Sequence, residues 1–229
     1  MDATGKLNSP CSSLHRLIPF LDLGNVYISD KYNYRVRKIV ASTSIITSIA
    51  GTGASGYSGD GGQATAAAIQ YPVGINLDSA GNIYFGDNGN YYIVRKITVS
   101  NGIISTVAGT SSASGYNGDN IQATAASFNT PHDVSLDSYG NLYISDWFNN
   151  RVRKVTVSTG IITTVVGTGT ASSTGDGSAA TAATINGPCY SRLDSAGNLY
   201  ITEIVGYKVR KVVTVSTDIP TSTPSYTPR

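Results

Sequence analysis

The chain has 229 residues, a formal net charge of +2 and 13% charged residues, so no acidic or basic bias points to a strongly charged partner. No run of about 18 apolar residues occurs, which predicts no membrane span, and two cysteines do not make a disulfide framework. The 25 Gly and 15 Tyr residues, with few Glu and Lys, are typical of an all-β protein with many tight turns.

One phrase of about ten residues recurs along the chain and sets its organisation. It reads LDLGNVYISD at 21–30 and returns at 77–87, 136–146 and 193–203. The Gly of its Gly-Asn pair falls at 24, 81, 140 and 197, in steps of 57, 59 and 57 residues. The chain is therefore built from four units of similar length.

The third unit shows the strands that we expect in each unit. Strand A lies near 133–137, B near 142–146, C near 150–157 and D near 161–167. Turn-forming residues separate A from B and C from D. A four-stranded antiparallel meander at a fixed period is a propeller blade. We predict an all-β fold, a β-propeller of about four blades in an open or incomplete ring, with a β-helical or leucine-rich solenoid as the alternative.

The expected propeller occupies residues 1–216. An extra segment around Cys11 to Pro19 is expected to disturb strand A of the first blade. Residues 217–229 form a Ser/Thr/Pro-rich tail or linker, and their prolines cannot donate to a ladder, so the fourth unit is expected to lack strand D. The predicted blade units cover about 10–51, 71–109, 130–167 and 187–216.

The phrase from Pro131 to Val155, P-x-x-V-x-L-D-S-x-G-N-L-Y-I-S-D-x-x-N-x-R-V-R-K-V, resembles an NHL repeat. The long loop GDG-x-x-ATAA between units is similar to loops of repeats in bacterial and algal surface proteins and in teneurin-like proteins. The resemblance covers nearly the whole chain. It implies a ring that closes with about six blades, of which this chain would be a fragment, and it says little about function because such propellers serve many roles.

The loops between strands B and C are unusually aromatic and are expected to lie on one face, here called the top. Rings on a rigid scaffold suit protein or carbohydrate contacts, because they bury area at low entropy cost. The alternative is that these rings only cover neighbouring loops. The predicted binding residues are Trp147, Phe148, Tyr32, Tyr34, Tyr91, Tyr92 and Tyr207.

Strand C carries 11 of the 16 basic residues in the repeated Arg-Val-Arg-Lys phrases. They offer a basic arc for nucleic acid, which is one alternative function. We favour local ion pairs across the B–C hairpin instead. The expected pairs are Asp30 with Arg35, Asp146 with Arg151, and Glu203 with Lys208.

The loops between units each carry one acidic residue, Asp60, Asp119 or Asp176. One carboxylate does not make a calcium site, and no Gly-Lys-Ser/Thr follows, so the sequence predicts no metal, phosphate loop or cofactor. Asp60 with Gln63, and Asp119 with Gln122, have capping-box spacing, so we expect these acids to cap a short helical turn.

Strand A lines the propeller axis and offers His132, Asp133, Tyr190 and Arg192 as axial channel residues. A metal-dependent propeller lyase or hydrolase would place several His or acidic groups there, and this is the other alternative function. The chain has two His in all, so we expect a packed imidazole at His132. Cys189 and Cys11 are expected to be buried thiols, with a disulfide conceivable only if four blades close into a ring.

The favoured function is a non-catalytic interaction scaffold that binds a protein or a glycan through its top-face loops. Further blades of a longer parent chain, or self-association, are expected at the exposed terminal blade. The tail favours an extracellular or cell-surface setting. The first residues lack a basic region followed by an apolar core, so they predict no signal peptide.

Overall fold

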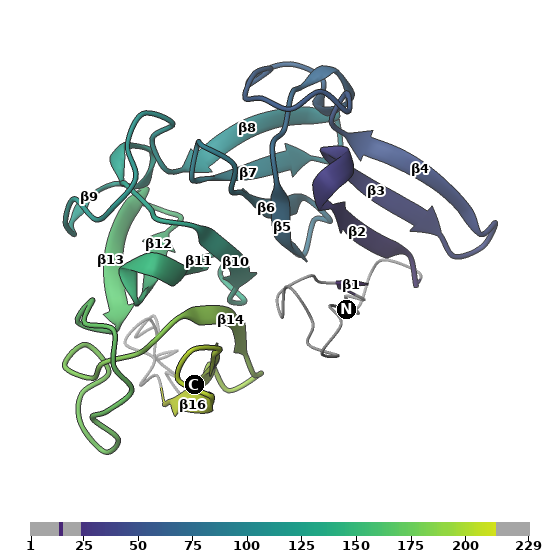
Figure 1. Cartoon of the computed structure of the whole chain (residues 1–229). Coiled ribbons are helices and arrows are strands. Elements are labelled where there is room, and N and C mark those ends of the chain that lie inside the picture. The colour runs from purple at the N-terminus through teal and green to yellow at the C-terminus, as the bar shows by residue number, and fades with distance from the viewer. Residues whose placement is uncertain (1–13, 16–23, 214–229) are drawn as a thin grey trace, which may run out of the picture.

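The computed structural model describes residues 14–15 and 24–213, which form four antiparallel sheets arranged as an open arc (Figure 1). Apart from 14–15, the expected extra segment at Cys11 to Pro19 lies outside the described residues, and so does the predicted tail at 217–229. Within each sheet the main strands follow one another in chain order, as the predicted meander requires. The all-β propeller of four blades is therefore confirmed.

Four sheets make four blades. Blade 1 contains β1 (Leu14–His15), β2 (Val26–Asp30), β3 (Arg35–Val40) and β4 (Ile45–Ala50). Blade 2 contains β5 (Pro72–Leu77), β6 (Ile83–Asp87), β7 (Ile93–Thr98) and β8 (Ile103–Ala108). Blade 3 contains β10 (Pro131–Leu136), β11 (Leu142–Asp146), β12 (Arg151–Thr156) and β13 (Ile161–Val166), with β9 (Ile121–Gln122) added beside β13. Blade 4 contains β14 (Pro188–Leu193), β15 (Leu199–Glu203) and β16 (Lys208–Val212).

Short 3-10 turns connect some of these strands, and no described helix is long and apolar enough to cross a bilayer. The turns are η1 (Lys31–Asn33), η2 (Ala64–Ala66), η3 (Ala123–Ala125) and η4 (Trp147–Asn149).

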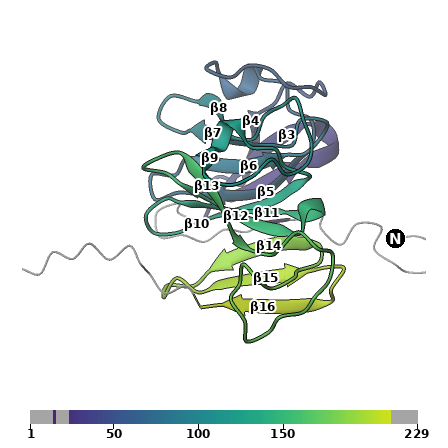
Figure 2. The same cartoon turned by 90° about the vertical axis from the view of Figure 1, so that its left-hand side faces the viewer.

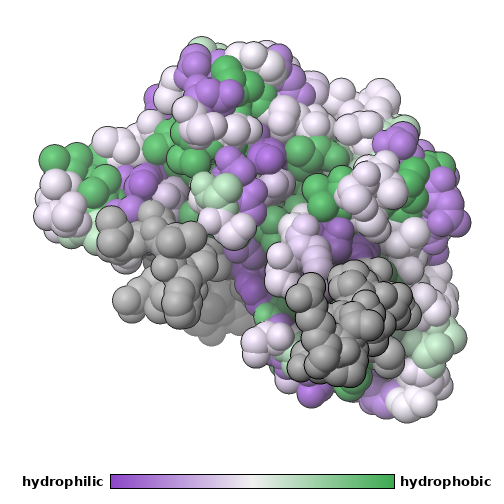
Figure 3. All heavy atoms as spheres, turned by 180° about the vertical axis from the view of Figure 1, so that it is seen from behind, coloured by the Kyte–Doolittle hydropathy of each residue, from purple (hydrophilic) through white to green (hydrophobic). Residues whose placement is uncertain are grey.

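The hydrophobic core lies between the blades. One cluster joins Val36 of blade 1 to Phe85 of blade 2, and a second joins Val94 of blade 2 to Ile144 of blade 3. These side chains are fully buried, so both faces of the inner blades are apolar. The face seen in Figure 3 mixes hydrophobic and hydrophilic residues. Blade stability therefore depends on stacking against neighbours.

The Gly-Asn pair of the repeated phrase recurs in each unit because it forms part of the A–B turn. Asp137 accepts hydrogen bonds from the backbone N–H of Asn141 at 2.9 Å and from its side-chain amide at 2.8 Å. Gly140 adopts φ +82°, a region that favours glycine. The Asn141 Oδ1 then accepts the N–H of Val157, at 3.0 Å, in the C–D turn. The A–B and C–D turns therefore lie together on one face, the bottom.

The long loop before a blade pairs with the outer strand of that blade. Gln63 forms a bridge with Ile103 of β8, and β9 pairs with β13. Gln63, and not Asp60, precedes η2, and its side chain makes no capping hydrogen bond. The prediction that Asp60 and Asp119 cap a helical turn is therefore wrong, because both carboxylates bind arginines of strand C instead.

Candidate functional site

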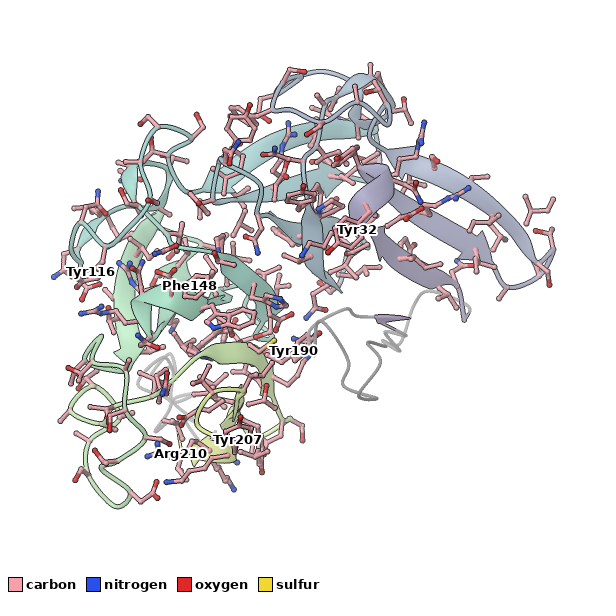
Figure 4. The ribbon with its side chains drawn as sticks, in the orientation of Figure 1. Tyr32, Tyr116, Phe148, Tyr190, Tyr207 and Arg210 are labelled. Carbon is pink, nitrogen blue, oxygen red and sulfur yellow. The ribbon has the colours of Figure 1, made fainter. Side chains whose placement is uncertain are left out.

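The top face carries the B–C loops, on the side opposite to the tied bottom turns. Figure 2 shows the helical turns that follow β2 and β11 projecting on the same side of the stack. Figure 4 shows Tyr32, Phe148 and Tyr207 on three different blades of the arc. The predicted aromatic residues therefore come from separate blades onto one face.

The loop of blade 3 presents a stacked aromatic pair. The rings of Trp147 and Phe148 are 5.5 Å apart and nearly parallel, with an interplanar angle of 20°. Phe148 is 62% exposed, whereas Trp147 is half-buried. The side-chain amide of Asn149 donates to Asp146 at 2.7 Å and to the carbonyl of Gly115 at 2.6 Å. These bonds fix the turn that holds the pair.

Blade 1 has a second aromatic group, in which Tyr71 joins the two predicted tyrosines. The ring of Tyr71 lies 5.9 Å from Tyr32 and 5.8 Å from Tyr34. The Lys31 ammonium lies 5.4 Å from the Tyr32 ring centre and 5.5 Å from that of Tyr71, within cation–π range. Tyr32 is 73% exposed. Sequence reasoning missed Tyr71, although its place just before strand A puts it in a top-face loop.

The remaining predicted top residues differ in their surroundings. Tyr207 is 92% exposed on blade 4. Tyr91 packs against Tyr57 at 5.3 Å and is half-buried, as is Tyr92. The alternative that the rings cover neighbouring loops therefore holds best for Tyr91.

Two of the predicted axial residues, Asp133 of blade 3 and Arg192 of blade 4, contact each other. Asp133 is almost fully buried and forms an ion pair with Arg192, and it also accepts the backbone N–H of Ser191 at 3.0 Å. The close packing extends to blade 2, where Gly74 lies against the backbone of Asp133. Polar contacts therefore join blades 3 and 4, and a close backbone approach joins blades 2 and 3.

His132 is buried at 4% exposure and is surrounded by rings. Its imidazole lies 5.0 Å from Trp147 and 5.8 Å from Tyr190, both edge-on. Among the described residues, no group of three His, Cys, Asp or Glu is placed to hold a metal ion. His132 thus has the packed environment that the sequence suggested.

Cys189 is disulfide-bonded, so the expectation of a buried thiol is wrong at this position. Its Sγ lies 3.4 Å from His132 Nδ1. Cys11 lies outside the described residues. A disulfide at Cys189 therefore occurs in an open arc, and not only in a closed ring of four blades as expected.

The strand C arginines form ion pairs, but in a different register from the predicted one. Asp30 pairs with Arg37 at 3.5 Å, and Glu203 pairs with Arg210 at 3.0 Å. The first basic residue of the phrase binds a carbonyl instead, as when Arg35 donates to Thr52 O at 2.7 Å. The predicted pairs of Asp30 with Arg35, Asp146 with Arg151 and Glu203 with Lys208 are therefore wrong.

The physical reason is that the acid at the end of strand B is held by the loop before its blade. Asp87 accepts the N–H of Gln70 at 2.8 Å, and Asp146 accepts that of Asn129 at 2.8 Å. Arg151 donates to Thr168 O at 2.6 Å. The acid therefore points away from the residue directly across the hairpin.

The loop acids and the second arginine of strand C meet in a buried cluster. Arg95 has no exposed surface and contacts Asp60 at 2.6 Å and Asp87 at 3.8 Å. Burial disfavours the charge of Asp60, but hydrogen bonds from Thr106 and Arg95 outweigh it and lower the pKa of Asp60. An arginine held in this way is not available to bind a nucleic-acid phosphate.

Tyr116 is a further exposed ring that sequence reasoning missed. It stacks over Arg151, whose guanidinium lies 3.9 Å from the ring centre, and is itself 39% exposed. The signal for it was the repeated Gly-Tyr-x-Gly-Asp phrase of the long loops, in which Tyr57 has the same position.

Comparisons with known proteins support the same fold. The family model of the teneurin NHL domain matches residues 24–117. The chain is 33% identical to mouse teneurin-4 over 150 residues, which cover 58% of this chain and 5% of that protein. It is 29% identical to zebrafish teneurin-3 over 227 residues, which cover 85% of this chain and 8% of that protein. The chain therefore spans less than a tenth of the length of these relatives.

A solved structure of a Bacteroides thetaiotaomicron protein of unknown function superposes with a TM-score of 0.65 at 24% identity, covering 82% of this chain and 44% of that chain. The four stacked meanders, the repeated phrase and these matches agree. These matches support an NHL-repeat family for this β-propeller.

Proposed function

We propose that this chain is a non-catalytic interaction scaffold that binds a protein or a glycan through its top-face loops. The observation that carries the proposal is Phe148, a 62% exposed ring stacked on Trp147 and held on a turn fixed by Asn149. An aromatic side chain that is already ordered loses little entropy when a partner covers it. Such rings are typical anchors of interfaces.

The distribution of rings over the top face supports the same proposal. Tyr32 on blade 1 and Tyr207 on blade 4 are both more exposed than Phe148. Exposed apolar rings that recur on one face of a rigid scaffold are typical of contact surfaces. A partner that spans neighbouring blades would cover several of them.

The test uses Trp147, which is the only Trp of the chain, as an intrinsic fluorescent reporter of the top face. A glycan array and a panel of purified cell-surface ectodomains are screened, and hits are titrated by Trp fluorescence. We expect Phe148→Ala to weaken binding by about tenfold or more. The matched control is Tyr139→Ala, which removes a 58% exposed ring from the bottom A–B turn.

The control should bind as the wild type does. Equal losses in Phe148→Ala and Tyr139→Ala, or full binding by Phe148→Ala, would place the contact elsewhere and contradict the proposal.

A further inference from the structure

The last described blade lacks the outer strand that its sister blades have. In blade 2, β8 lies between β7 and the long loop that precedes the blade, and in blade 3 β13 lies between β12 and β9. In blade 4 the described sheet ends at β16 (Figure 2). The outer edge of β16 and the preceding loop, 167–187, therefore face a position that a strand occupies in blades 2 and 3.

A cavity of about 390 Å³ marks this position, and we call it the blade 4 slot. Its apolar wall is formed by Ala180, Ala183, Ile185 and Val212. In blade 2 the corresponding space is occupied by Ile104 of the outer strand, which is fully buried.

The neighbours of this isoleucine repeat from blade to blade. In the core of blade 2, Ile104 belongs to one cluster with Ala64, Ala67 and Ile69 of the preceding loop. These three loop residues have the same places in the repeat as Ala180, Ala183 and Ile185. The blade 3 cluster pairs Ile162 with the corresponding set, Ala123, Ala126 and Phe128. The slot is therefore shaped to take an isoleucine of an outer strand.

A polar determinant lies beside the apolar one. In blade 3, Asp119 binds Arg153 at 3.0 Å and accepts the hydroxyl of Thr164 at 3.0 Å. In blade 2, Asp60 accepts the backbone N–H of Thr106 at 3.0 Å. The loop acid thus contacts both strand C and a threonine of the outer strand.

In blade 4 only half of this arrangement is present among the described residues. Asp176 binds Arg210 at 2.6 Å, but its side chain is 72% exposed, against 34% for Asp60 and 30% for Asp119. The side chain of Asp176 is therefore much more accessible than those of the corresponding acids in blades 2 and 3.

The ladder registers fix how an incoming strand would align. Thr106 is the cross-strand partner of Arg95, and Thr164 is the partner of Arg153. By the same register, a threonine would stand opposite Arg210. The isoleucine that fills the apolar wall precedes this threonine by two residues, on the same face of the strand.

We propose that the blade 4 slot binds a separate extended segment of the sequence type Ile-x-Thr, added antiparallel to β16. The isoleucine enters the apolar wall, the threonine reaches Asp176, and backbone hydrogen bonds complete the outer edge of the sheet. This edge is distinct from the top-face loops, so the proposal stands independently of the proposed function.

The chain's own continuation is a poor occupant on chemical grounds. The continuation contains its own Ile-x-Thr segment, Ile219-Pro220-Thr221. Matching the Val-Ser-Thr before it to that of blade 3 places Pro220 where Ile162 stands, whereas the register set by Arg210 places Pro220 where Ser105 and Thr163 pair with strand C. In either alignment the proline removes a backbone donor of the outer strand. The N–H of Ile104 donates to Gly62 O at 3.0 Å, and a proline has no N–H to donate. A separate segment that keeps both the isoleucine and the donor fits better.

The experiment titrates the full chain with a fluorescein-labelled peptide of residues 159–168, TGIITTVVGT, flanked by lysines for solubility, and measures anisotropy. We expect saturable binding that is lost with Ile162→Pro in the peptide. Thr164→Val in the peptide, or Asp176→Asn in the protein, should each weaken binding by about tenfold. Tyr139→Ala in the protein is the control and should leave peptide binding unchanged.

Hydrogen exchange of the β16 amides in the full chain distinguishes the other occupants. Slower exchange only after the peptide is added supports the proposal. Slow exchange in the dilute chain alone would show that its own residues fill the slot, and slow exchange only at high protein concentration would show that a second copy does. Either result would overturn the proposal, as would the absence of peptide binding or equal binding of the proline peptide.

Discussion

At the residue scale, the buried acids at the ends of strand B couple the top loops to folding. Asp87 and Asp146 have no exposed surface. Asp87 accepts the backbone N–H groups of Gln70 and Tyr71, and Asp146 accepts that of Asn129, all in the loop before the blade. Loss of hydration raises the pKa of Asp146 to about 7, against the hydrogen bonds from Asn149 and Asn129. The same cause raises the pKa of Asp87 to about 6. Desolvation thus outweighs the hydrogen bonds at both sites.

These raised pKa values predict how stability depends on pH. Because the folded pKa of Asp146 lies above its ordinary value of 3.8, folding favours the protonated carboxyl. Its contribution is fully present below about pH 4 and is lost as the pH rises through about 7. We expect Asp146→Asn to reduce this loss by roughly 2 to 4 kcal/mol, measured by urea unfolding at about pH 5 and about pH 8. An unchanged pH dependence in the variant would contradict this expectation.

At the element scale, strands and short turns could be predicted from the sequence because their causes are local. Gly140 and Asn141 act within one turn, and the predicted strand B at 142–146 coincides with β11. The contact between Arg95 and Asp60 could not be predicted, because it joins residues 35 positions apart through a loop whose path depends on the stacked blades. The top-face rings were predictable as a group, and their individual exposure was not, because neighbouring loops decide it.

The contact between the inner strands of blades 2 and 3 gives a prediction at the same scale. Gly74 of β5 has φ +47°, and a Cβ there would lie 2.4 Å from the Cα of Asp133 and from the carbonyl oxygen of His132. We expect Gly74→Ala to lower the free energy of unfolding by about 3 kcal/mol or more, measured by urea titration.

Gly61→Ala is the matched control for this variant. Gly61 has φ +81° but nothing within 4 Å of the added Cβ, so it carries the backbone strain alone, about 1 kcal/mol. Equal losses in the two variants would show that the close approach of β5 and β10 does not matter.

At the scale of the whole molecule, the arc gives its blades unequal support. The inner strand β10 packs against both β5 and β14, so blade 3 has a neighbour on each side. Blade 4 stacks on blade 3 through Ile201 and Leu199, while Val209, paired with Thr202 on the other face of the sheet, is 71% exposed. In a stack of units, stability is roughly the sum of each unit and its interfaces. The outermost described blade therefore has fewer stabilising contacts than blade 3.

This inequality predicts an ordered pattern of local opening. Amides of β11 and β12 should exchange most slowly in native-state hydrogen exchange, and those of β16 at least about tenfold faster. Ile144→Ala, which empties a buried position between blades 2 and 3, should cost about 3 kcal/mol and should speed exchange in both of those blades. A protein that instead opened all four sheets at one rate would behave as a single cooperative unit. The interfaces between blades would then be too strong for the open arc to unravel from its end.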